Sequence, residues 1–200
     1  MLYWLIILQN YTVMSLATLN LTLIYLWAIL ELILTIKKRS SSKGRQDRSS
    51  LRAIWLALLI GLLAANWIET YHPLGVFSHT IWIQVIALLA LLVGFIIRYV
   101  AIYTLKRFFT FDVHVEQNHQ LIQSGLYHWI RHPAYLGTLL IIAGIGLQFD
   151  NLGSWSVLMV FAIGVHLYRI QVEEAILLKH FGIPYEKYQR QSWRLLPFIY

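Results

Sequence analysis

Long apolar runs dominate this sequence and limit the chain to folds that a membrane can hold. The runs cover about residues 15–36, 51–68, 80–103, 133–149 and 154–168. A helix that crosses a bilayer needs roughly 20 mostly apolar residues, and it satisfies its own backbone hydrogen bonds. The chain is 58% hydrophobic and only 12% charged, about half the charged share of a soluble domain. We expect an all-α integral membrane protein with about five transmembrane helices. Residues 1–14 are also apolar and either extend the first helix or lie at the membrane interface.

Basic residues follow alternate apolar runs. They crowd the loop after the first run, flank the link between the third and fourth, and follow the fifth, whereas loops 69–79 and 150–153 contain no Lys or Arg. This pattern predicts a multi-pass protein whose N-terminus faces outward and whose C-terminus faces the cytosol. The same pattern explains the net charge of +7, so the charge does not indicate that nucleic acid is a partner. Arg98 is the one basic residue that this alternation does not explain, because it lies inside the third run. We expect its long side chain to reach the membrane surface.

Several kinds of site are excluded or disfavoured by the residues present. The chain has no cysteine, which excludes disulfides, thiolate catalysis and zinc–thiolate sites. Neither H-E-x-x-H nor H-x-x-E-H occurs, so we expect no metal site. The glycine-rich loops of the familiar nucleotide-binding folds are also absent.

Three polar stretches interrupt the apolar pattern, and all lie on the predicted cytosolic side. Residues 111–127 are expected to form an extended loop with a turn at Ser124-Gly125. Pro133 suits the first turn of a helix, which places His132 just before the fourth helix. Arg169 and Glu173, at the end of the fifth run, are four residues apart and share one helix face. Ionisable residues at membrane helix ends can mark a functional site, but basic flanking residues or a surface ion pair would give the same pattern.

The three stretches together resemble a known family. His119-Gln120-Leu121-Ile122, Gly125-Leu126-Tyr127 and Arg131-His132-Pro133-Ala134-Tyr135-Leu136-Gly137 resemble the signature of the isoprenylcysteine carboxyl methyltransferase family. The larger group of related enzymes includes membrane phospholipid N-methyltransferases. The ending is also similar, with Glu173-Glu174, His180-Phe181-Gly182, Tyr185, Tyr188 and Leu195-Leu196-Pro197. The resemblance covers about residues 80–200, so we divide the chain into an N-terminal two-helix membrane region (1–79), which carries the basic cytosolic loop, and a catalytic region (80–200).

The resemblance implies a cytosolic pocket for S-adenosylmethionine, formed by the C-terminal half of the chain. The cofactor-binding residues it implies are His119, Gln120, Leu121, Ile122, Tyr127, His132, Pro133, Ala134, Tyr135 and Glu173. It also implies that Arg169 binds the carboxylate of the substrate, and that Arg169 and His132 are catalytic. Gln171 and Val172 replace acidic residues of relatives, which bears on the identity of the substrate more than on the cofactor.

The expected reaction is methyl transfer to a lipophilic acceptor that reaches the pocket from the membrane lipids. A carboxylate acceptor, such as that of a prenylated cysteine, is ionised at neutral pH and needs a cation but no base. An amine acceptor, as in a phospholipid N-methyltransferase, would need a base such as His132 or Glu174. Two alternative hypotheses are that the chain is a NADPH-dependent membrane reductase of the steroid-reductase type, or a membrane protein without enzymatic activity.

Overall fold

The computed structural model describes residues 2–37, 49–76, 80–110 and 120–199. Within these ranges the chain forms helices and no strand, as predicted. The α-helices are α1 (Leu2–Lys37), α2 (Ser49–Tyr71), α3 (Ile81–Leu105), α4 (Pro133–Gly146), α5 (Leu152–Phe181) and α6 (Ile183–Gln191). Three short 3₁₀ helices are η1 (Lys106–Phe108), η2 (Gly125–His128) and η3 (Leu147–Phe149).

Five of these helices are apolar and match the five predicted runs. Four of them, α1, α2, α3 and α5, are long and apolar enough to cross a membrane. The fourth run forms a shorter apolar helical stretch, Pro133–Phe149. The 14 residues of α4 extend only about 21 Å, less than the roughly 30 Å of a hydrocarbon core.

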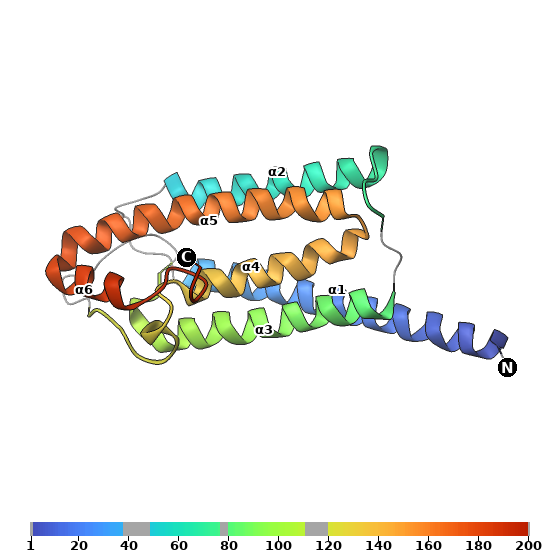
Figure 1. Ribbon diagram of the computed structural model, residues 1–200, viewed down its shortest axis with the longest axis horizontal. Helices are drawn as coiled ribbons and strands as arrows, with labels where there is room; N and C mark the ends of the chain where they lie inside the picture. The colour runs from blue at the N-terminus through green and yellow to red at the C-terminus, as the bar shows by residue number, and fades with distance from the viewer. Residues whose placement is uncertain (1, 38–48, 77–79, 111–119, 200) are drawn as a thin grey trace.

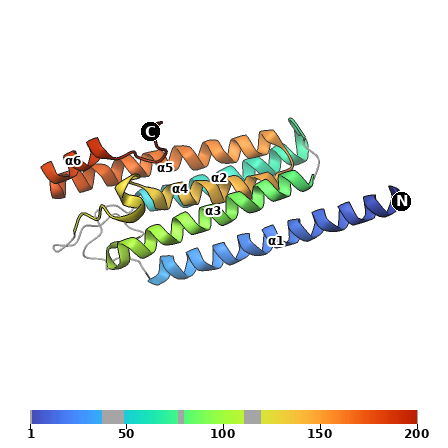
Figure 2. The ribbon, with the colours of Figure 1, turned by 60° about the horizontal axis from the view of Figure 1, so that its bottom comes forward.

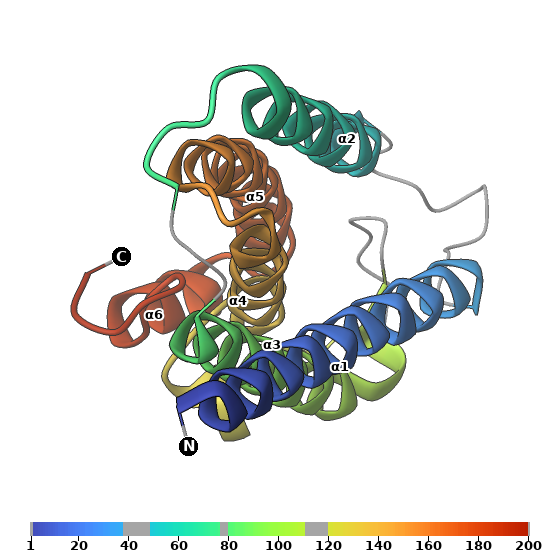
Figure 3. The same cartoon turned by 90° about the vertical axis from the view of Figure 1, so that its right-hand side faces the viewer.

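The long helices pack as neighbouring pairs (Figures 1 and 2). α2 lies along α5, α5 contacts α4, α4 lies along α3, and α1 packs on α3. Seen end-on, α2 and α1 stand on opposite sides of the bundle (Figure 3). The N-terminal end of α1 projects beyond the other helices, while η1, η2 and α6 lie at the opposite end, which we call the site end (Figure 1).

Glycines bring α3 and α4 into backbone contact. A Cβ atom added to Gly137 would lie 2.7 Å from the Gly94 oxygen and 2.7 Å from the Arg98 nitrogen. One added to Gly144 would lie 2.9 Å from Leu91 Cγ. Only residues without a side chain allow this approach, which fixes the start of α4 against α3.

Two helices are longer than their apolar runs. α1 begins at Leu2, so residues 2–14 belong to the first helix. α5 continues to Phe181 instead of ending near Tyr168, and it stops where Gly182 adopts a positive φ of 59°. An apolar run marks the part of a helix that suits lipid, whereas the helix itself continues until glycine or proline interrupts it. Arg169 and Glu173 therefore lie well inside α5 and not at its end.

The expectation that Arg98 reaches the membrane surface is wrong. Its side chain is buried and binds the carboxylate of Glu31 on α1 with Nε and Nη2, at 2.5 and 2.6 Å. Nη1 donates to Thr138 Oγ1 on α4 at 2.6 Å. An acidic partner within reach on the neighbouring helix removes the need for the guanidinium to find water.

Candidate active site

The predicted site residues converge on one cavity in the site-end half of the bundle. Its lining includes Gln120, Leu121, Ile122, Tyr127, His132, Ala134, Tyr135, Arg169 and Glu173. Pro133 begins α4 and is buried, but it does not line the cavity. His119 lies outside the described residues. The structure thus brings together three stretches that lie far apart in the sequence, between Gln120 and Glu173.

The start of α4 is held by the end of the chain. Arg131 N–H donates to the Trp193 carbonyl at 2.7 Å, and His132 N–H donates to the Arg194 carbonyl at 3.1 Å. His132, with φ −124° and ψ 56°, lies outside the α region before Pro133, as the sequence predicts. The segment after α6 therefore fixes where the side chains of His132 and Tyr135 stand.

A hydroxyl group joins the two predicted charged residues of α5. Tyr135 donates its hydroxyl hydrogen to Glu173 Oε2 at 2.7 Å, and Arg169 Nε donates to the same hydroxyl oxygen at 3.2 Å. Arg169 Nη1 also donates to Ser50 Oγ at the start of α2. Tyr135 thus faces the cavity, and Arg169 and Glu173 form part of a network across α2, α4 and α5.

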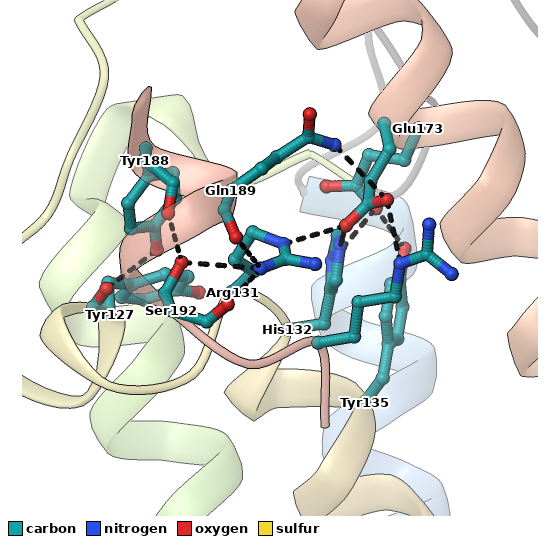
Figure 4. Close-up of polar contacts among 10 residues, drawn as sticks. Tyr127, Arg131, His132, Tyr135, Glu173, Tyr188, Gln189 and Ser192 are labelled. Atoms are coloured by element: carbon teal, nitrogen blue, oxygen red, sulfur yellow. Dashed lines mark hydrogen bonds and ion pairs between the residues drawn. The ribbon is translucent and has the colours of Figure 1, made fainter. Parts of the chain in front are cut away.

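Glu174, the neighbour of Glu173, belongs to a different network (Figure 4). Its carboxylate accepts from Arg131 Nε at 2.8 Å and from Arg194 Nε at 2.9 Å, and it lies 3.3 Å from His132 Nε2. The side chain is buried. A carboxylate whose two oxygens accept from two guanidinium groups has little capacity left as a proton acceptor. Glu174 is therefore a poor base and serves to fix the start of α4 and the chain end.

Buried tyrosines from η2 and α6 form the cavity wall at the site end. Tyr188 donates its hydroxyl hydrogen to the Tyr127 carbonyl at 2.6 Å. Tyr185 is 1% exposed, and its hydroxyl has no hydrogen-bond partner among the described residues. Burial raises the pKa of Tyr127 and Tyr185, and raises the pKa of Tyr188 to about 12. All three phenols are therefore neutral at physiological pH, and the Tyr185 hydroxyl is available to a bound ligand.

Sequence reasoning missed several residues that line the cavity or contact its lining. Ser50, which contacts Arg169, lies in a region without any motif. Glu31 and Arg98 line the cavity from α1 and α3, and His166 lines it from α5, one turn before Arg169. A signal was present for Glu31 and Arg98, because ionisable residues inside apolar runs mark functional positions. No sequence signal indicated Ser50.

Known proteins are similar to this chain in sequence and in fold. The model of the isoprenylcysteine carboxyl methyltransferase (ICMT) family matches residues 85–179. Protein-S-isoprenylcysteine O-methyltransferase A of Arabidopsis thaliana is 32% identical over 146 residues, which cover 72% of this chain and 73% of that protein. Protein-S-isoprenylcysteine O-methyltransferase of Tribolium castaneum is 33% identical over 143 residues, 66% of this chain and 48% of that one.

A solved structure of the eukaryotic intramembrane Ras methyltransferase ICMT superposes with a TM-score of 0.56 and 26% sequence identity. The match covers 75% of this chain and 51% of that chain. The chain therefore spans about half the length of the solved structure and of the Tribolium relative. The matched region contains the whole predicted catalytic motif between Arg131 and Glu173. The chain belongs to the isoprenylcysteine carboxyl methyltransferase family, a family of methyltransferases.

Proposed function

We propose that this protein methylates the carboxylate of a lipophilic acceptor, such as a prenylated cysteine, with S-adenosylmethionine as cofactor. The observation that carries the proposal is the position of Arg169 and Glu173. Both line one cavity, joined through the Tyr135 hydroxyl, so that a cation and an anion stand side by side. Family membership supports methyl transfer over the two alternative hypotheses, a reductase and a protein without enzymatic activity.

The residues present fit the proposed cofactor, which supplies an activated methyl group on a cationic sulfur. Glu173 offers a carboxylate to the positive groups of the cofactor, and the unpaired Tyr185 hydroxyl offers a hydrogen bond. The rings of His132 and Tyr135 stack with centroids 5.6 Å apart at 21°. We propose that these residues hold the cofactor together with His119, Tyr127 and the segment Gln120–Ile122.

We assign the acceptor carboxylate to Arg169. A guanidinium group held by Tyr135 and Ser50 presents its charge in a fixed orientation. The carboxylate is ionised at neutral pH, so its oxygen can attack without losing a proton, and the products are the methyl ester and the demethylated cofactor. The protein then has mainly to align the two reactants, and good alignment can lower a barrier by roughly 7–11 kcal/mol.

The cavity wall from α2 suits the hydrocarbon part of the acceptor. Leu51, Ile54, Trp55 and Leu58 line it, and Trp27 of α1 lines the opposite side. Since α1 packs on α3 and α2 packs on α5, a lipophilic chain can approach between α1 and α2 from the bilayer. The cofactor would come from the cytosol, because the positions of the basic loops predict that the site end faces this side of the membrane.

Both bases that the sequence suggested for an amine acceptor lie in contact with charged partners. Of the two bases proposed for it, Glu174 is bound by two guanidinium groups. His132 lies 3.3 Å from Glu174 and 3.9 Å from Glu173, so its two ring nitrogens face carboxylates. A carboxylate acceptor needs neither residue to accept a proton.

Binding of S-adenosylmethionine to the detergent-purified protein, measured by calorimetry with NADPH as comparator, tests the cofactor. We expect saturable binding that Glu173→Gln abolishes and Glu186→Gln retains, because Glu186 is an exposed carboxylate on α6. Methyl transfer to S-prenyl N-acetylcysteine, compared with phosphatidylethanolamine vesicles, tests the acceptor. Binding of NADPH alone would refute the proposed cofactor, and methylation of the amine lipid alone would refute the carboxylate acceptor.

A further inference from the structure

A buried pair of opposite charges, formed by two residues that are not part of the predicted catalytic motif, lies inside the helical bundle. Glu31 of α1 and Arg98 of α3 are each 5% exposed, and two N–H···O bonds of 2.5 and 2.6 Å join them. Both residues line the same cavity as Arg169. Ionisable residues in a membrane segment are expensive to bury, so their presence beside a cavity calls for a reason.

The pair is not needed to hold α3 against α4. The backbones of those helices already touch at Gly94 and Gly137, and further apolar contacts follow along both helices. Arg98 donates to Thr138 Oγ1 and to the Ala134 carbonyl of α4, which orients the guanidinium. What the ion pair adds is a connection from this rigid α3–α4 unit to α1.

α1 has few other specific connections to the bundle. It packs on α3, and many of its apolar side chains are exposed. At the end away from the site, Asn20 Nδ2 donates to Gln84 Oε1 at 2.9 Å. At the site end, the two parallel bonds between Glu31 and Arg98 fix both the rotation and the axial position of α1, because a bidentate contact tolerates little displacement.

We propose that Glu31 and Arg98 are positioning residues that hold α1 as one wall of the acceptor pocket. α1 contributes Trp27 and Glu31 to the cavity, opposite the α2 residues Leu51, Ile54 and Trp55. The position of α1 therefore sets the width of the cavity between α1 and α2. The inference rests on the proposed function, since it assigns this part of the cavity to the lipophilic acceptor and not to the cofactor.

The experiment compares an ion-pair variant with a matched control. Glu31→Leu/Arg98→Met removes both charges and leaves no unpaired ion, a replacement that proteins often tolerate well. Asn20→Leu removes the polar contact of α1 with Gln84, outside the cavity lining. For S-prenyl N-acetylcysteine, we expect the double variant to raise KM at least tenfold. Its kcat and its affinity for S-adenosylmethionine should stay within about twofold, and Asn20→Leu should leave all three unchanged.

A second measurement does not depend on activity. The chain has no cysteine, so spin labels at Ile29→Cys on α1 and Leu56→Cys on α2, both exposed positions, report the distance between these helices. We expect the double variant to broaden or shift that distance and Asn20→Leu to preserve it. An unchanged distance or an unchanged KM in the double variant would overturn the inference. Failure of the wild type to methylate the acceptor would overturn the proposed function, while the distance would still show whether the pair positions α1.

Discussion

Two adjacent glutamates show how position within a helix turn decides the role of a residue. Successive residues on a helix point about 100° apart. Glu173 lines the cavity and accepts from Tyr135, whereas Glu174 accepts from Arg131 and Arg194. The pair Glu173-Glu174 was recognisable in the sequence, and the resemblance assigned the cofactor to Glu173. The separate ionic network of Glu174 could not be predicted, because its partners lie 43 residues before it and 20 residues after it.

Replacing Glu174 with Gln should destabilise the fold more than replacing Glu173. The change leaves Arg131, whose side chain is only 8% exposed, without its carboxylate. Breaking a buried pair in this way costs about 3–5 kcal/mol. Thermal unfolding in detergent should show a clearly lower Tm for Glu174→Gln than for Glu173→Gln. Equal Tm values for the two variants would contradict the structural role of Glu174.

Removing the Tyr135 hydroxyl should weaken cofactor binding without unfolding the protein. Tyr135→Phe retains the ring that stacks on His132 but loses the link between Arg169 and Glu173. A hydrogen bond to a charged group contributes about 1.5–3 kcal/mol, so the affinity for S-adenosylmethionine should fall by about tenfold or more. Calorimetry measures the change, with Tyr103→Phe on the exposed face of α3 as control. An affinity equal to that of the control would show that the hydroxyl does not organise the site.

Among the elements, the apolar runs predicted which helices exist but not how they pair. Pro133 correctly predicted the start of α4. Hydrophobicity could not reveal that α5 extends to Phe181, because lipid contact ends before the helix does. Nor could it reveal that Ser50 of α2 contacts Arg169 across 119 residues. Such partners depend on the register in which two helices pack, and in this chain that register is set by buried small and polar side chains.

The contact between α3 and α4 should not tolerate even one added methyl group. In Gly137→Ala the new Cβ would meet backbone atoms of Gly94 and Arg98 at 2.7 Å, so the helices would have to separate. Overpacking of this kind typically destabilises by about 1–3 kcal/mol. Gly164→Ala is a matched control on α5, because no atom lies within 4 Å of its added Cβ. We expect thermal unfolding in detergent to show a lower Tm for Gly137→Ala only, and equal Tm values would contradict the close approach.

For the whole molecule, the cavity arises where residues of the six α-helices meet, near one end of the bundle. Arg169 lies about 26 Å along α5 from Leu152, close to the thickness of a hydrocarbon core. The charged part of the site therefore stands near the level at which α5 would leave the membrane. That arrangement suits a reaction between a water-soluble cofactor and a lipophilic acceptor. Most of the described residues that the sequence predicted for the site line the cavity, but only the packing shows that the first two helices, which carry no motif, complete it.

The orientation of the bundle in the membrane remains a prediction from the basic loops, and the lack of cysteine makes it directly testable. Single cysteines at Arg190 on α6 and at Leu74 beyond α2 are exposed at opposite ends of the bundle. A membrane-impermeant maleimide applied to intact cells should label Leu74→Cys and should label Arg190→Cys only after permeabilisation. The reverse pattern would place the site end outside the cell, away from the cytosolic supply of S-adenosylmethionine. The proposed reaction would then have no access to its cofactor, whatever the purified protein binds in detergent.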